Sequence, residues 1–65
     1  MKYFFLISDT SGDFVVIDAI HIAQKWIEKQ AKDLWKPIKG PDTIFLSRYE
    51  IHRDLYLLML LKFSK

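Results

Sequence analysis

The chain has 65 residues, of which 51% are hydrophobic and 28% charged, and it contains no cysteine. This composition is typical of a folded domain and excludes the disordered and disulfide-stapled classes. The formal charge of +2 is too small to indicate a nucleic-acid-binding protein by itself. We expect one small domain over residues 1–65, whose thin core leaves partner binding or self-association as a further source of stability.

Two short apolar runs near the N-terminus predict a β-hairpin. Residues 3–7 and 14–17 are rich in aromatic and β-branched side chains, which favour strands. The segment 8–13 between them consists of Ser, Asp, Thr and Gly, which favour turns. The sharp change in composition at both ends of this segment indicates two strands joined by a loop.

The next segment has the spacing of an amphipathic helix. Apolar residues recur every three or four positions from Ile20 to Leu34, while lysines occupy other positions on the helical wheel. Asp18 is a suitable N-cap, and Pro37 disfavours a helical conformation for the residue before it. The pattern predicts a helix over residues 19–35, followed by a connector at 36–42 that contains two prolines and a glycine.

The C-terminal third is compatible with two structures. Residues 43–46 predict a third strand, and Ser47 with Glu50 matches a capping box that would start a helix over residues 48–63. The alternative is a hairpin of residues 43–51 and 55–63. The helix is favoured because a turn at residues 52–54 lacks the usual glycine or Asn-Gly signal.

These elements define an α+β fold, in which a small antiparallel sheet is packed by an amphipathic helix. With a C-terminal helix the order of elements is ββαβα. With the alternative hairpin it is ββαββ.

The most distinctive stretch is the apolar run at residues 55–63, in which Lys62 is the one residue that is neither apolar nor aromatic. It shows neither the single stripe of a surface helix nor the alternation of a surface strand. On a helix, Leu55 and Leu58 would face the sheet, and other residues would remain outside the core. We expect this surplus to form a surface for self-association or a protein partner, through Tyr56, Leu57, Leu60 and Leu61.

A second candidate surface is the basic series of the predicted helix. Lysines interleaved with tryptophan can bind phosphates and stack bases, and a partly exposed tryptophan is equally suited to anchor a protein contact. The acidic residues Glu28 and Asp33 dilute the charge, so nucleic-acid binding is the alternative function rather than the leading one. The candidate residues are Lys25, Lys29, Lys32, Trp35 and Lys36.

The sequence offers little for catalysis or metal binding. His21 and His52 are far apart, and neither lies in a motif with metal-ligand spacing. The segment 52–55 spells the start of the protein-kinase catalytic loop, but Met59 stands where that loop has Asn, and the chain is too short for the kinase fold. We therefore expect no enzymatic activity, no cofactor and no bound metal.

These features favour a non-enzymatic, cytoplasmic module that binds a larger protein, with a homodimer as a further expectation. In size and plan such a domain resembles phage- or mobile-element-encoded inhibitors of host machinery, such as polymerase inhibitors and anti-CRISPR proteins. The resemblance implies a steric mechanism, in which apolar anchors bury against the target while the lysines steer toward an acidic patch. The apolar run is too short to span a bilayer as a helix.

Overall fold

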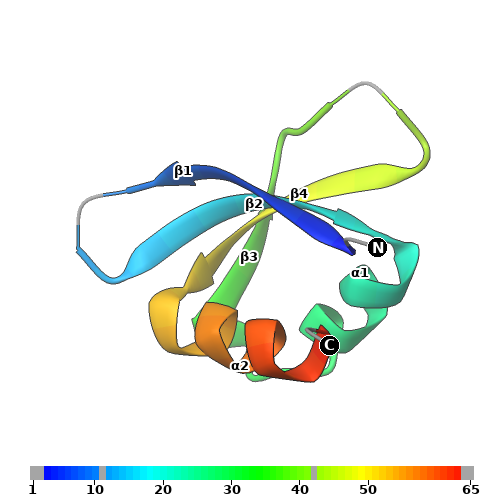
Figure 1. Ribbon diagram of the computed structural model, residues 1–65. Coiled ribbons are helices and arrows are strands. Elements are labelled where there is room, and N and C mark those ends of the chain that lie inside the picture. Colours follow the sequence, from blue (N-terminus) through cyan, green and yellow to red (C-terminus); the bar gives the residue numbers. More distant parts are fainter. Residues whose placement is uncertain (1–2, 11, 42, 64–65) are drawn as a thin grey trace.

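The computed structural model describes residues 3–10, 12–41 and 43–63, so Ser11 of the predicted loop and Asp42 of the predicted connector lie outside the described residues. An antiparallel sheet of four strands carries two α-helices on one side (Figure 1). The predicted α+β class is confirmed. The elements in chain order are β1 (Phe4–Asp9), β2 (Phe14–Ile20), α1 (His21–Glu28), a short 3₁₀ turn η1 (Lys32–Leu34), β3 (Trp35–Ile38), β4 (Leu46–His52) and α2 (Arg53–Phe63).

The strands β2 and β4 form the centre of the sheet, whose order is β1-β2-β4-β3. They pair along their whole length, from Phe14 opposite His52 to Ile20 opposite Leu46. Because side chains alternate along a strand, one face of this pair is apolar and meets both helices. The buried core consists of Val15, Ile17, Ala19, Ala23, Ile27, Tyr49, Ile51, Leu55 and Met59.

The predicted helix over residues 19–35 begins too early. Residues up to Ile20 belong to β2, and the helix begins at His21. Asp18 does not cap it, because the Asp18 carboxylate accepts hydrogen bonds from Arg48 across the sheet. The long-range ion pair therefore replaces the local cap that the sequence suggests.

The predicted helix also ends too late, because α1 stops at Glu28. Trp35 leaves the helical path to pack edge-to-face against Tyr49, with the ring centroids 5.7 Å apart, and its indole N–H donates to the carbonyl of Gln30 at 3.1 Å. Trp35–Ile38 then pairs with β4 as an edge strand. Pro37 is tolerated there, since an edge strand does not need every N–H for its ladder.

The strand β3 gives the chain one more strand than the predicted order ββαβα. The observed order is ββαββα, apart from the 3₁₀ turn. The alternative hairpin of residues 43–51 and 55–63 is wrong, because residues 53–63 form α2 and the partners of β4 in the sheet are β2 and β3.

The predicted C-terminal helix is confirmed, but its start and its cap are wrong. Ser47 and Glu50 lie within β4, where the alternating side chains of Tyr49 and Ile51 fill the core. Residues 43–46 are likewise not the third strand that was expected there, because β4 begins at Leu46. Packing across the sheet thus extends the strand through the segment that resembles a capping box.

His52 supplies the cap instead. Its Nδ1 accepts the backbone N–H of Asp54 at 3.1 Å, which satisfies one of the free donors of the first helical turn. The N–H of Arg53 donates to the carbonyl of Asp13 at 2.6 Å. The helix therefore starts where the strand ends, without an intervening loop.

The face of the sheet opposite the helices carries an ion pair between the central strands. Arg48 donates from Nε to Oδ1 of Asp18 at 2.7 Å and from Nη2 to Oδ2 at 3.1 Å. This hydrogen bonding raises the pKa of Arg48 above its ordinary value. Asp18 is only 6% exposed, and this two-point contact gives both of its carboxylate oxygens a hydrogen-bond donor.

Arg48→Met should lower the free energy of unfolding clearly more than Lys36→Met does, because it leaves the buried Asp18 carboxylate without its partner. Lys36→Met is the matched control: Lys36 contacts Glu50 at 3.3 Å but is exposed, and its loss should cost less than about 0.5 kcal/mol. Replacing both Asp18→Val and Arg48→Met should recover most of the stability. Urea unfolding measures all three, and equal losses in the two single variants would contradict the role of Asp18.

Candidate partner-binding surface

The helix α2 places much of the apolar run outside the core. Leu55 and Met59, one turn apart, are fully buried beneath the sheet. Four other leucines remain in contact with solvent, and together we call them the leucine surface. Their exposed fractions are 51% for Leu57, 56% for Leu58, 36% for Leu60 and 77% for Leu61.

Aromatic contacts hold the C-terminal half of α2 in place. Phe63 packs against Tyr3, with the ring centroids 5.2 Å apart, and against Trp26 at 6.1 Å. Phe4 of β1 packs edge-to-face against Tyr56 at 5.9 Å. Tyr56, a candidate from the sequence, is therefore partly buried and anchors α2 rather than extending the leucine surface.

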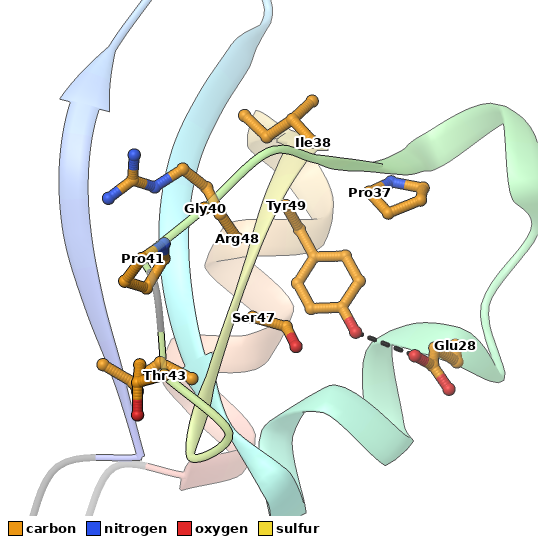
Figure 2. Close-up of a pocket in the computed structure, with 10 residues that line it drawn as sticks. Glu28, Pro37, Ile38, Gly40, Pro41, Thr43, Ser47, Arg48 and Tyr49 are labelled. Atoms are coloured by element: carbon orange, nitrogen blue, oxygen red, sulfur yellow. Dashed lines mark hydrogen bonds between the residues drawn. The ribbon is translucent and has the colours of Figure 1, made fainter.

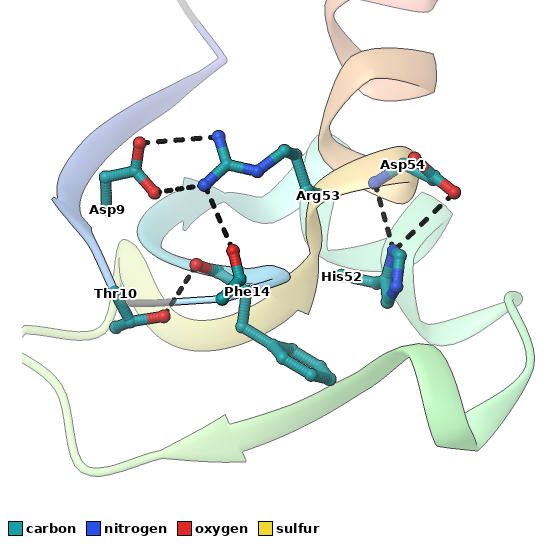
Figure 3. A network of polar contacts seen from close by, with 7 residues as sticks. Asp9, Thr10, Phe14, His52, Arg53 and Asp54 are labelled. Atoms are coloured by element: carbon teal, nitrogen blue, oxygen red, sulfur yellow. Dashed lines mark hydrogen bonds and ion pairs between the residues drawn. The ribbon is translucent and has the colours of Figure 1, made fainter.

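Polar contacts hold the N-terminal end of α2 (Figure 3). Arg53 donates from Nη2 to Asp9 at 2.6 Å and to the carbonyl of Gly12 at 3.3 Å, which ties the helix to the hairpin of β1 and β2. His52 packs edge-to-face against Phe14, with the ring centroids 5.4 Å apart. The segment that resembles a kinase loop thus serves to start and fix the helix.

The leucine surface occupies the side of α2 that points away from the sheet. Leu57 and Leu61 are one turn apart, and Leu58 lies one turn from Asp54 in one direction and from Lys62 in the other. A helix that is apolar on all sides is normally buried on all sides. Here one side is uncovered, which is typical of a surface that meets another protein.

Leu57, Leu60 and Leu61, three of the residues expected to form a partner surface, are exposed on α2. Leu58 was expected to face the sheet and is exposed as well. Leu58 follows Leu55 by three residues and Met59 follows it by four, and either spacing can place two residues on the same face of a helix. The sequence alone therefore does not show which of the two is buried, and in the structure it is Met59.

The basic candidates do not lie along one helix. Lys25 is on α1, and Lys29 directly follows it; Lys32 is on η1, and Trp35 and Lys36 are on β3. All four lysines are exposed, but Trp35 packs on Tyr49 and is partly buried. Trp26 packs on Phe63, so both tryptophan rings are packed against other aromatic side chains at the edge of the core.

Other exposed apolar residues belong to other elements of the fold. The edge strand β1 exposes Phe5, Leu6 and Ile7, and the segment before β4 exposes Ile44 and Phe45. The pairing of β1 with β2 is interrupted between Leu6 and Ser8, an irregularity that is typical of protected sheet edges. The leucine surface differs from these groups in lying on a helix that is fixed at both ends.

A hollow of about 410 Å³ lies between β4 and the chain that follows β3 (Figure 2). At Gly40 this chain passes so close to β4 that a Cβ atom there would lie 2.6 Å from the Cβ of Arg48. The described residues that line the hollow include no histidine or cysteine. They are Glu28, Pro37, Ile38, Gly40, Pro41, Thr43, Leu46, Ser47, Arg48 and Tyr49.

The polar contact in this hollow is structural. The Tyr49 hydroxyl donates to Oε2 of Glu28 at 2.8 Å, which links β4 to the end of α1. Burial raises the pKa of Tyr49, and the hydrogen bond to Glu28 raises it further. This hydrogen bond joins two elements of the fold, and a hydroxyl held in its protonated form is a poor general base.

Within the described residues, no three His, Cys, Asp or Glu side chains converge on a point where they could hold a metal ion. Neither α1 nor α2 has the length and hydrophobicity that a membrane-spanning helix needs. No protein family, curated protein or solved structure matches the chain. The leucine surface is therefore the strongest candidate site on geometric grounds.

Tyr49→Phe should lower the free energy of unfolding by about 1 kcal/mol at neutral pH, because it removes the hydrogen bond to Glu28. The raised pKa also predicts a pH dependence. The stabilisation is complete below the ordinary tyrosine pKa of 10.0, and it is lost as the pH rises above that value, because the unfolded chain releases the proton first.

Unfolding measured between neutral and alkaline pH should therefore show a decline above pH 10.0 that is smaller in Tyr49→Phe than in the unchanged protein. Tyr56→Phe is the matched control, since the Tyr56 hydroxyl has no side-chain partner among the described residues. If Tyr56→Phe reduced the alkaline decline as much as Tyr49→Phe does, the assignment to Tyr49 would be wrong.

Proposed function

We propose that this protein is a small, non-enzymatic protein-binding module whose binding surface is the leucine surface of α2. The observation that supports this most directly is the exposure of four leucines on the outer side of one helix. Soluble proteins rarely leave such a contiguous apolar patch uncovered unless another molecule binds it.

The fixed position of α2 supports the same function. The Arg53–Asp9 ion pair holds one end, and the packing of Phe63 against Tyr3 holds the other. A surface on a rigid element loses little conformational entropy on binding, so more of the apolar contact is available as affinity. A helix with exposed leucines also suits a known mode of recognition, in which the apolar side of a helix lies in a groove of the partner.

The proposed partner is a larger protein in the cytoplasm, and the proposed mechanism is steric. The leucines would bury in an apolar groove of the partner, and the exposed Lys25 and Lys29 would favour an acidic rim around that groove. Inhibitors of the phage or mobile-element type, such as polymerase inhibitors and anti-CRISPR proteins, would act in this way. Nucleic-acid binding is the weaker candidate, because Trp26 and Trp35 are packed and not free to stack on bases.

Leu61→Glu should weaken binding of the partner at least about tenfold, because it puts a charge in the middle of the apolar contact. The variant should stay folded, with its free energy of unfolding changed by less than about 1 kcal/mol, since Leu61 is mostly exposed. Affinity capture with the immobilised protein, followed by titration of each captured protein, measures the effect.

Two variants provide controls for this experiment. Ile44→Glu makes the same apolar-to-charged change at an exposed residue outside α2, in the segment before β4, and should leave binding through α2 within about threefold. Met59→Ala should instead destabilise the fold by about 2–4 kcal/mol, because Met59 is buried. A Leu61→Glu variant that still binds the same proteins equally well would refute the proposed surface.

A further inference from the structure

We infer that a second copy of the chain covers the leucine surface, in a two-fold symmetric pair whose α2 helices run antiparallel. The inference rests on the proposed function, because it names one occupant of the same surface. Four observations support it: the charges at the two ends of α2, the absence of a Lys, Arg, Asp or Glu partner for them among the described residues of one copy, the exposed apolar area, and the small size of the domain.

The charged residues at the two ends of α2 have opposite signs, so two copies of the helix attract each other when they run antiparallel. Asp54 lies four residues before Leu58, and Lys62 lies four residues after it, so the three form one row along the helix. If the two-fold axis passes near Leu58, Asp54 of each copy lies beside Lys62 of the other. A parallel pair would instead place like charges together and align the helix dipoles unfavourably.

Within one copy these two charges cannot satisfy each other. Eight residues of helix separate Asp54 from Lys62 by about 12 Å along the axis. Their exposure is also high, with the Asp54 side chain at 84%. They are therefore available to a partner that presents the opposite charge at the same spacing, as a second antiparallel α2 does.

The neighbours of Asp54 and Lys62 do not neutralise them. His52 Nδ1 lies 3.9 Å from the Asp54 carboxylate and already accepts the backbone N–H of Asp54. Among the described residues, Lys62 contacts only the ring of Phe63 through its ammonium group, 5.9 Å from the ring centroid. Both charges thus remain open at the ends of the leucine surface.

The size of the surface fits a weak, reversible dimer. The three leucines nearest the two-fold axis, Leu57, Leu58 and Leu61, expose an area on the order of 350 Å² per copy, which is typical of the largest apolar patch on a monomer. Leu60 lies on the opposite side of the helix from Leu58, at the margin of this contact. With the flanking Asp54 and Lys62, two copies would bury roughly 1,000 Å², at the lower limit for a specific interface. A small domain without disulfides gains stability from such a contact.

A weak dimer and a larger partner would compete for the same residues. The second copy would shield the leucines from non-specific association, and it would be displaced when the partner with the better-fitting groove is present. Binding of a larger protein should then weaken at chain concentrations above the dimer dissociation constant.

Analytical ultracentrifugation of the full chain over a series from about 1 μM to 1 mM tests the inference, because this range brackets a weak dissociation constant. The unchanged protein should shift from monomer to dimer within the series. Leu61→Glu should raise the dissociation constant at least about thirtyfold, as expected for a charge in the centre of an apolar contact. If Leu61→Glu loses its fold, Leu57→Gln tests the same contact and should raise the dissociation constant about tenfold.

Charge variants test the antiparallel arrangement. Asp54→Lys and Lys62→Asp should each weaken the dimer about three- to tenfold, because each places like charges side by side at both ends. The double variant with both changes exchanges the two charges and should restore the dimer. Circular dichroism and urea unfolding at monomer concentrations show whether each variant keeps its fold.

The outcomes separate this inference from the proposed function. A protein that stays monomeric throughout the series, or whose dimer is unaffected by Leu61→Glu and Leu57→Gln, overturns the inference. If such a monomer still captures a larger protein through Leu61, the proposed function stands alone. If the dimer forms and responds as described but no larger protein binds, the inference holds, and the proposed role against a larger target does not.

Discussion

The structure depends on the pairing of β2 with β4. These two strands contribute the centre of the core on one face through residues such as Ile17 and Ile51. On the other face they carry the ion pair between the buried Asp18 and the partly exposed Arg48. Both helices pack on the apolar face of this pair of strands. Because α1 occupies part of that face, α2 can bury only a few of its side chains against the rest. Only Leu55 and Met59 of α2 are buried, so the remaining leucines stay outside.

The exposed leucines are a property of the fold rather than of a loose helix end. The residues that fix α2 come from distant parts of the chain: Asp9 and Gly12 contact its start, and Tyr3 and Trp26 contact its end. A patch held this way keeps its shape before a partner arrives. The hollow beside β4 offers no comparable site, because its Tyr49–Glu28 hydrogen bond links two elements of the fold and leaves no reactive pair.

Local patterns in the sequence predicted the α+β class, the first hairpin, a C-terminal helix and the apolar surplus on that helix. The features that they missed are those decided by contacts between distant residues. The helix stops at Glu28, and Trp35 lies in β3, where its ring packs on Tyr49. Asp18 binds Arg48 and does not cap the helix. The sequence also did not predict that Met59 rather than Leu58 is buried in the core, because this depends on the residue at which β4 ends and α2 begins. At that junction Nδ1 of His52 caps the helix by accepting the backbone N–H of Asp54, and the common capping patterns do not include a histidine at this position.

The place of β4 beside β2 also affects how the chain folds. The two strands are separated by the segment that contains α1, η1 and β3, and the ion pair between them joins residues 30 positions apart. Bringing the two strands together costs conformational entropy, and this cost is offset only when the hydrogen bonds and side-chain contacts between β2 and β4 form. The hairpin of β1 and β2 and the helix α1 are local and can form early, so the meeting of β2 with β4 sets the folding rate. For its size the domain should therefore fold more slowly than a helical bundle, on the millisecond rather than the microsecond scale typical of local contacts.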